Sequence, residues 1–391
     1  MTDALIYIVA GEASGDVLGA RLMRAMRRQQ AGLTFAGIGG ARMAEEGLDS
    51  LFPMHDLALM GLAEVLPRIP KLQRRMAETV ADITARRPDV VVTIDSPGFA
   101  LRLLRRIAPL GLPRAHYVAP QAWAWREKRV RKYPGLWDRL LCLLPFEVAF
   151  YAGHGLAAEF VGHPVLESGA DTGDAARFRA MHDLAPDSLP VILMPGSRVT
   201  EIARLLPIFA EALRLLEARF PTIVPIMPVA ASVAARVTEA ASGWPRKPIL
   251  VTDVAGKHDA FAAATVALTK SGTSTLELAL AGLPMVVAYK VNPITAAIVK
   301  RVVRVRYAAM VNLLAGREVV PELIQWTCTP ERLAMEVSQL IERPDAAAAQ
   351  RSAFAAVMDS LRPASGLPSD AAAAAVLNLL AEKAGRPHQS V

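Results

Sequence analysis

Short apolar runs alternate with longer amphipathic stretches through the first part of the chain. The runs of strand length lie at 5–10, 89–95, 115–120 and 139–144. Stretches such as 17–28 and 71–87 instead repeat apolar residues at helical spacing. Strands and helices that alternate in this way predict a parallel sheet with helices on both of its faces.

The same alternation stops and then restarts in the second half of the chain. The later strand-like runs lie at 190–195, 223–228, 248–252, 265–269 and 285–289. We therefore expect an α/β protein with two tandem Rossmann-like, doubly wound domains, over 1–165 and 190–350. The segment between them, 166–189, is rich in Gly, Pro and Asp and is predicted to be a linker. Residues 351–391 are predicted to form C-terminal helices that end in a frayed tail.

Composition limits the classes of protein to which the chain can belong. Apolar residues make up 53% of the sequence and charged residues 21%, which excludes a disordered chain. The 44 basic and 37 acidic residues give a net charge of +7, which suits phosphates, nucleic acid or acidic lipid. Two cysteines without zinc-site spacing predict neither a disulfide framework nor a metal site. The N-terminus lacks a signal-peptide pattern and no apolar run reaches about 18 residues, so a cytoplasmic location is expected.

Each half of the chain opens with a strand, a glycine-containing turn and a helix. The turns contain Gly11, Ser14 and Gly15 in the first half, and Gly196, Ser197 and Arg198 in the second. Backbone N–H groups at a helix N-terminus form an anion site, and a guanidinium such as that of Arg198 binds phosphate oxygens in pairs. A tight turn without a ligand is the alternative for each. Neither turn has the glycine spacing of a dinucleotide site or of a P-loop.

A third glycine turn, "KSGTSTLE", follows the predicted strand 265–269. It lies at the carboxyl end of the second sheet, where doubly wound folds bind ligands. Ser271, Gly272 and Thr273 offer N–H and hydroxyl donors to a phosphate, and Glu277, one helical turn further on, can accept hydrogen bonds from both hydroxyls of a ribose. This combination suits a nucleoside diphosphate, and a solvated helix carboxylate is the alternative reading of Glu277.

Five collinear segments resemble one enzyme family. "SGTSTLELALAGLPMVV" is similar to the nucleotide-binding signature of GT-B glycosyltransferases, and "VAGEASGD", "HYVAPQAWAWR", "MPGSR" and "NLLAGRE" resemble segments of lipid A disaccharide synthases. The resemblance implies an inverting transferase, with its active site in an interdomain cleft, that joins a UDP-2,3-diacylglucosamine donor to a 2,3-diacylglucosamine 1-phosphate acceptor. It also implies a donor or acceptor contact for Asn312. Two positions depart from the family pattern, with Gly98 in place of an aspartate and Val199 in place of a glycine.

Transfer of a sugar requires a general base beside the attacking hydroxyl and a group that stabilises the departing diphosphate. Asp95 ends a predicted strand of the first domain, so we expect it to face the cleft as the base. Arg198 and the turn amides would stabilise the diphosphate, because no D-x-D spacing indicates a bridging metal. A turn cap before Pro97 is the alternative for Asp95, and His116 is the next candidate base. No cofactor is expected.

The stretch 56–76 is unusually apolar and has basic residues beside it. Its predicted membrane contacts are Leu62, Leu66, Arg68, Ile69 and Lys71. From sequence alone a core helix with a solvated basic face is favoured, although Pro67 and Pro70 interrupt it. The acylated substrates implied by the resemblance instead favour contact with an anionic membrane surface. We therefore expect a peripheral protein at the inner face of the inner membrane.

Three other functions share part of this pattern. Basic runs with interleaved aromatic residues are compatible with RNA, but no nucleic-acid module has this spacing, so no nucleic acid partner is expected. A non-catalytic sugar-nucleotide sensor would keep Ser271 and Glu277 without needing Asp95. A UDP-N-acetylglucosamine 2-epimerase shares the fold and the glycine–helix–glutamate element, but it does not account for "WAWR" or for the stretch 56–76. The sequence indicates no oligomeric state.

Overall fold

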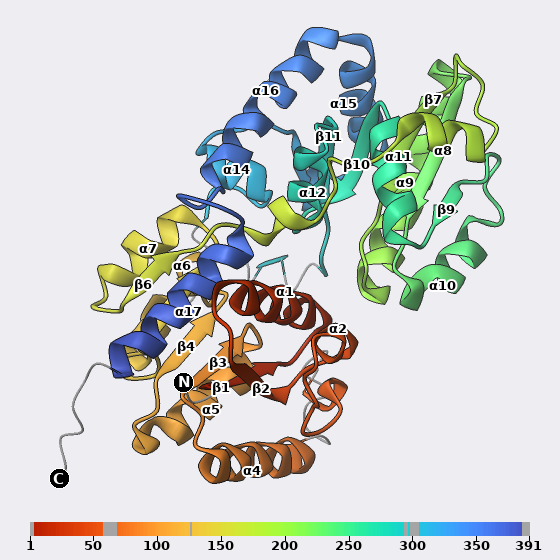
Figure 1. Ribbon diagram of the computed structural model, residues 1–391. Helices are drawn as coiled ribbons and strands as arrows, with labels where there is room; N and C mark the ends of the chain where they lie inside the picture. The colour runs from red at the N-terminus through yellow and green to blue at the C-terminus, as the bar shows by residue number, and fades with distance from the viewer. Residues whose placement is uncertain (1–3, 58–68, 126, 293–295, 298–304, 385–391) are drawn as a thin grey trace. The chain divides into compact units, whose positions relative to one another are not determined.

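The computed structural model describes residues 4–57, 69–125, 127–292, 296–297 and 305–384, which form two compact units (Figure 1). One unit comprises the residues up to Pro164 together with those from Leu361, and the other comprises Val165–Ser360. Each unit contains a six-stranded sheet, and every pair of neighbouring strands is parallel. The predicted fold class is confirmed. No helix in the described part of the chain is long and apolar enough to cross a membrane.

The first unit has the strand order β2-β1-β3-β4-β5-β6. Its strands are β1 (Ala4–Ala10), β2 (Leu33–Ile38), β3 (Val90–Ile94), β4 (Arg114–Tyr117), β5 (Arg139–Cys142) and β6 (Ala158–Phe160). Its α-helices are α1 (Ala13–Gln29), α2 (Ala41–Glu45), α4 (Ile69–Arg86), α5 (Pro97–Ile107), α6 (Ala122–Trp125), α7 (Pro145–Ala152) and α17 (Pro368–Ala384). Short 3-10 helices are η1 (Met54–Asp56), η3 (Ala108–Leu110) and η4 (Glu127–Lys132).

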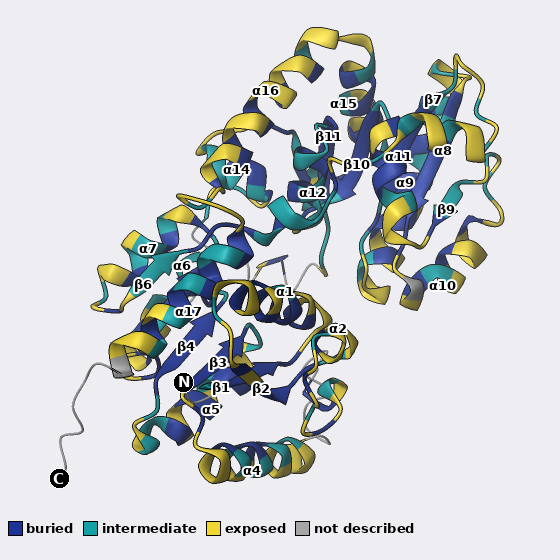
Figure 2. Cartoon of the chain, in the orientation of Figure 1, coloured by how far each residue is buried: buried dark blue, intermediate teal, exposed yellow. Residues whose placement is uncertain are grey.

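Alternate residues of β1 contribute to hydrophobic cores on the two faces of this sheet. Ile6 and Ile8 belong to the core that α1 and α17 cover, whereas Tyr7 and Val9 belong to the core on the side of α4 and α5. Because both faces are buried, the strand is apolar throughout instead of alternating with polar residues. Figure 2 shows buried strands between helices that expose only their outer sides.

The second unit has the strand order β12-β11-β10-β7-β8-β9. Its strands are β7 (Leu189–Met194), β8 (Ile223–Pro228), β9 (Ile249–Val251), β10 (Val266–Lys270), β11 (Met285–Tyr289) and β12 (Glu322–Ile324). Its helices are α8 (Ala175–Met181), α9 (Val199–Arg219), α10 (Ala231–Ala241), α11 (Val254–Ala263), α12 (Ser274–Leu280), α14 (Met310–Ala315), α15 (Pro330–Glu342) and α16 (Pro344–Ser360), with the 3-10 helix η6 (Gln325–Thr327). A further 3-10 helix, η5, spans Pro164–Glu167.

The segment 166–189, expected to be a linker, contains α8 and is part of the second unit. Its polar residues make structural contacts there: Arg177 forms two hydrogen bonds of 2.6 Å with Asp259 of α11. Gly173 passes so close to α11 that an ideal Cβ would lie 2.0 Å from the His258 carbonyl oxygen. The C-terminal region is divided, since α16 belongs to the second unit and α17 packs on α1 of the first.

Candidate active site

In the first unit, the carboxyl ends of β1 and β3 bring the first glycine turn beside Asp95. An ideal Cβ on Gly11 would lie 2.5 Å from Ser96 Oγ, so a larger residue at this position could not fit without moving the neighbouring loop. Gly15 is buried in the first turn of α1, and Ser14 is exposed in the same turn. The sheet therefore gathers the first glycine turn and the predicted base at one edge.

Asp95 and Ser96 both have left-handed backbone conformations, with φ of 49° and 45°. Two successive non-glycine residues in this region are strained, and such strain is typical of functional loops. The position before α5 belongs to Ser96, so Asp95 is not the N-cap of that helix. Burial raises the pKa of the half-buried Asp95 carboxyl, although a hydrogen bond from the Ser96 N–H opposes the shift.

His116, the alternative base, and a second histidine, His163, are packed in the interior of this unit. His116 is fully buried within β4, where Nδ1 lies 2.7 Å from Thr93 Oγ1 and the ring stacks on Trp137. Burial lowers the pKa of His116 to about 4 and that of His163 also to about 4. A histidine in this position inside a strand has no route to a sugar hydroxyl, so His116 is a poor alternative base.

The segment that contains "WAWR" is held in place from α7. Trp123 Nε1 donates a 2.9 Å hydrogen bond to Glu147, and the Tyr151 hydroxyl donates to the Pro120 carbonyl. Burial raises the pKa of Glu147 to about 7, although hydrogen bonds from Trp123 and from two backbone N–H groups oppose the shift. Val118, at the start of the segment, has a φ of 76°. These contacts fix the segment beside the carboxyl end of β4.

The stretch predicted to contact a membrane is described only in part. Leu62, Leu66 and Arg68 lie outside the described residues. Ile69 begins α4 and is 38% exposed. The Lys71 ammonium donates to the buried Asp56, which also accepts from Arg75 Nη2 at 2.7 Å. This pairing of Lys71 with Asp56 was not predicted from the sequence.

In the second unit, a polar pocket of about 380 Å³ lies at the carboxyl end of the sheet. Its lining comes from the turns that follow β7, β8, β9 and β10 and from the first turns of α11 and α12. The predicted residues that line it are Gly196, Ser197, Gly272, Thr273 and Glu277. Residues of two glycine turns, 76 positions apart along the chain, therefore share one site with the predicted ribose acceptor.

Two lysines, which the sequence did not single out, pair with the carboxylates of this pocket. Lys257 Nζ lies 3.0 Å from both carboxylate oxygens of Glu277. Lys270 Nζ lies 3.0 Å from Glu201 Oε1. Lys257 is placed in the first turn of α11, where Asp253 accepts the Gly256 N–H at 2.7 Å. A lysine in the first turn of a helix belongs to no recognisable sequence motif. Its position shortly after the end of a strand is the signal that could have indicated Lys257.

Two other predicted residues make structural contacts. The Ser271 hydroxyl donates to the Ala308 carbonyl at 2.7 Å, and its N–H donates to the Ala288 carbonyl. Both hydrogen bonds stabilise the turn itself. Asn312 is fully buried, and its amide makes four hydrogen bonds within the chain. The amide therefore has no hydrogen-bonding capacity left for a substrate in this structure. Arg198, by contrast, is 69% exposed at the start of α9.

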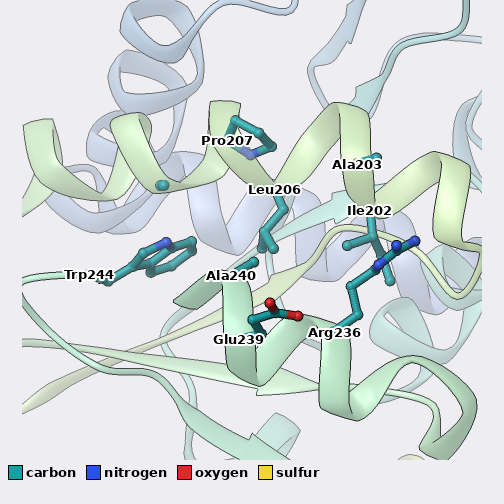
Figure 3. A pocket seen from close by; sticks show the side chains of 9 residues that line it. Ile202, Ala203, Leu206, Pro207, Arg236, Glu239, Ala240 and Trp244 are labelled. Carbon is teal, nitrogen blue, oxygen red and sulfur yellow. The ribbon is translucent and has the colours of Figure 1, made fainter. Parts of the chain in front are cut away.

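A larger hollow, of about 660 Å³, lies between α9 and α10 (Figure 3). Its lining is mostly aliphatic, with Ile202 and Leu206 on one side, Trp244 at one end and Arg236 near Ile202 at the other. It lacks the converging glycine turns of the polar pocket. A nucleotide is therefore expected in the smaller, polar pocket.

Comparison with known proteins identifies the family. A family model described as lipid-A-disaccharide synthetase matches residues 6–376. The chain is 60% identical to the lipid-A-disaccharide synthase of Granulibacter bethesdensis, over 98% of this chain and 100% of that protein. It is 57% identical to the enzyme of the same name from Gluconobacter oxydans, over 99% of this chain and 93% of that protein.

Solved structures are similar in fold. The S. aureus MnaA–UDP co-structure has a TM-score of 0.63 at 14% identity and covers 94% of both chains. The glycotransferase of kitacinnamycin has a TM-score of 0.63 at 17% identity, over 96% of this chain and 98% of that one. These likenesses concern the fold alone, whereas the family model and the relatives match nearly the whole sequence. The chain belongs to the family of lipid A disaccharide synthases.

Proposed function

We propose that the chain condenses UDP-2,3-diacylglucosamine with 2,3-diacylglucosamine 1-phosphate to give a β-1,6-linked disaccharide 1-phosphate and UDP. As a member of its family the chain is a hexosyltransferase that uses a sugar-nucleotide donor and a sugar acceptor. Family membership also favours glycosyl transfer over the epimerase reaction found on the same fold. The acyl groups and the phosphate of the acceptor are the specific part of the proposal.

The observation that carries the proposal is the polar pocket of the second unit. Gly196 and Gly272 bring backbone close to one space, which suits a diphosphate at the N-termini of α9 and α12. Glu277 faces the same space and can accept hydrogen bonds from the two ribose hydroxyls. Lys257 pairs with Glu277 in this structure. With a nucleotide bound, Lys257 would be shared between that carboxylate and the nucleotide.

In the proposed reaction, Asp95 accepts the proton of the acceptor's 6-hydroxyl as that oxygen forms a bond to C1 of the donor sugar. The bond between C1 and the diphosphate oxygen breaks on the opposite face, so its electron pair leaves with UDP and the anomeric configuration inverts. A pKa raised by burial makes the Asp95 carboxylate a better base. Arg198 and the turn amides stabilise the charge on the departing UDP.

The acyl chains of both substrates would lie in a bilayer, so we place the reaction at the inner face of the inner membrane. The exposed Ile69 at the start of α4 supports this placement. Arg74 on the same helix is exposed and pairs with Glu78 at 2.8 Å, and it would meet an anionic headgroup at about 1 kcal/mol.

The test is to incubate the protein with UDP-2,3-diacylglucosamine, with and without the acceptor, and to measure UDP and the sugar products. UDP release that requires the acceptor and yields one disaccharide supports the proposal. Epimerised donor, or no turnover with either mixture, contradicts it. Asp95→Asn serves as the matched control, since it should bind UDP normally but release UDP from the donor about 10²–10⁴-fold more slowly.

A further inference from the structure

Two backbone N–H groups and two cationic side chains converge on the carboxylate of Glu201, at the edge of the polar pocket. The N–H groups of Ser197 and Arg198 donate to Oε2 at 3.2 and 3.3 Å. Lys270 Nζ lies 3.0 Å and Arg198 Nη1 3.5 Å from Oε1. Burial opposes ionisation of Glu201, but Lys270 and the two N–H groups keep its pKa below the ordinary value. The carboxylate is therefore charged at neutral pH.

The same set of donors is the one that a phosphate group requires. Backbone N–H groups at a helix start, an ammonium and a guanidinium are the common ligands of phosphate oxygens in proteins. Gly196 leaves room for the carboxylate, since an ideal Cβ there would lie 2.5 Å from Glu201 Oε2, and Gly272 lines the same pocket as Glu201. The Glu201 carboxylate thus lies where two glycine turns meet.

We propose that Lys270 binds the diphosphate of the donor and that Glu201 occupies the place of a phosphate until the donor arrives. The inference rests on the proposed function, because it requires a nucleoside diphosphate in this pocket. When the donor binds, the Lys270 ammonium exchanges the Glu201 carboxylate for phosphate oxygens. The exposed guanidinium of Arg198 makes the same exchange. Lys270 and Arg198 carry two positive charges against the single negative charge of Glu201, so a diphosphate neutralises them more completely.

A purely structural role for Glu201 leads to the opposite expectation. Glu201 satisfies two N–H groups ahead of α9, and a residue that only caps the helix would hold the turn in shape for the nucleotide. Removing its charge would then weaken nucleotide binding. If Glu201 competes with phosphate, Glu201→Gln should strengthen binding, because glutamine keeps an oxygen for the N–H groups but loses the charge. The sign of the change separates the two roles.

The experiment is calorimetric titration of the full chain with UDP, UMP and uridine. Lys270→Met should lower the affinity for UDP about 10- to 100-fold, as expected when a hydrogen bond to a charged group is lost, and leave that for uridine unchanged. Lys270→Arg should keep most of the affinity. Glu201→Gln should raise the affinity for UDP several-fold without changing that for uridine. Lys247→Met, an exposed position outside the pocket, controls for net charge.

Each result has a distinct meaning. If Lys270→Met keeps the preference of the chain for UDP over uridine, or if Glu201→Gln weakens UDP binding, the inference is wrong while the proposed function stands. If the unaltered chain binds no UDP, the proposed function fails and the inference with it. Thermal unfolding of every variant, and the retained uridine affinity, show that the second unit is folded.

Discussion

Replacing Asn312 by alanine should destabilise the second unit without removing its nucleotide site. The side chain accepts the N–H groups of Val319 and Val320 at 2.7 and 2.9 Å, and donates to the Val320 carbonyl at 2.9 Å and to Glu322 at 2.7 Å. Three neutral bonds at about 1 kcal/mol each and one to a carboxylate at about 2 kcal/mol sum to about 5 kcal/mol. Because Glu322 still accepts the N–H groups of Ala308 and Ala309, part of this loss is recovered, and about 3–5 kcal/mol is expected.

Scanning calorimetry provides the assay. For a unit of this size, a loss of about 3–5 kcal/mol lowers the transition temperature by about 6–20 °C. UDP affinity, measured below that transition, should remain within about twofold of the unaltered chain. Asn378→Ala, an exposed position on α17, is the control and should leave both values unchanged. An unchanged transition temperature together with lost UDP binding would show that Asn312 is a substrate ligand and would refute the reasoning.

Three further outcomes follow from the described contacts. Glu277→Gln should weaken UDP binding by about 1–3 kcal/mol in calorimetry, because a charged acceptor of the ribose is lost, and equal affinity would exclude the ribose contact. Asp95→Asn should lower turnover by about 10²–10⁴-fold at saturating acceptor. Because burial raises the pKa of Asp95, the rate of the unaltered enzyme, followed as the pH is lowered, should begin to fall at a higher pH than it would with an ordinary carboxylate. Because the pKa of His116 falls from 6.5 to about 4 on folding, the first unit should lose stability as the pH drops through that window, and a urea midpoint that is flat across it would contradict the packed, neutral state.

Most of the strands could be predicted because strands buried on both faces are apolar throughout. The runs at 223–228 and 285–289 coincide with β8 and β11. Three strands were missed. β2 contains Thr34 and Gly37, and β6 and β12 have three residues each and include a glutamate, so none is a continuous apolar run. Their place in the sheet comes from pairing with neighbouring strands, which the local pattern does not record.

The candidate site could be predicted where function depends on backbone shape. The glycine turns at Gly196 and Gly272 are visible as sequence motifs, and the structure places both at one pocket. The partners Lys257 and Lys270 were missed, because their importance arises from distances between strands and helices far apart in sequence. Asn312 was predicted to contact a substrate because its motif resembles a family segment. The motif cannot distinguish an amide that binds a substrate from a buried amide with four internal hydrogen bonds.

Hydrogen exchange with and without UDP tests the central claim, that the second unit binds the nucleotide at its two glycine turns. The account predicts slower exchange in peptides that cover 194–202 and 269–279, with unchanged exchange in α10 and in peptides around Asn312. The protection at 269–279 should diminish in Glu277→Gln at equal UDP concentration. Protection confined to the hollow between α9 and α10, or to the first unit, with none at the two turns, would contradict the account.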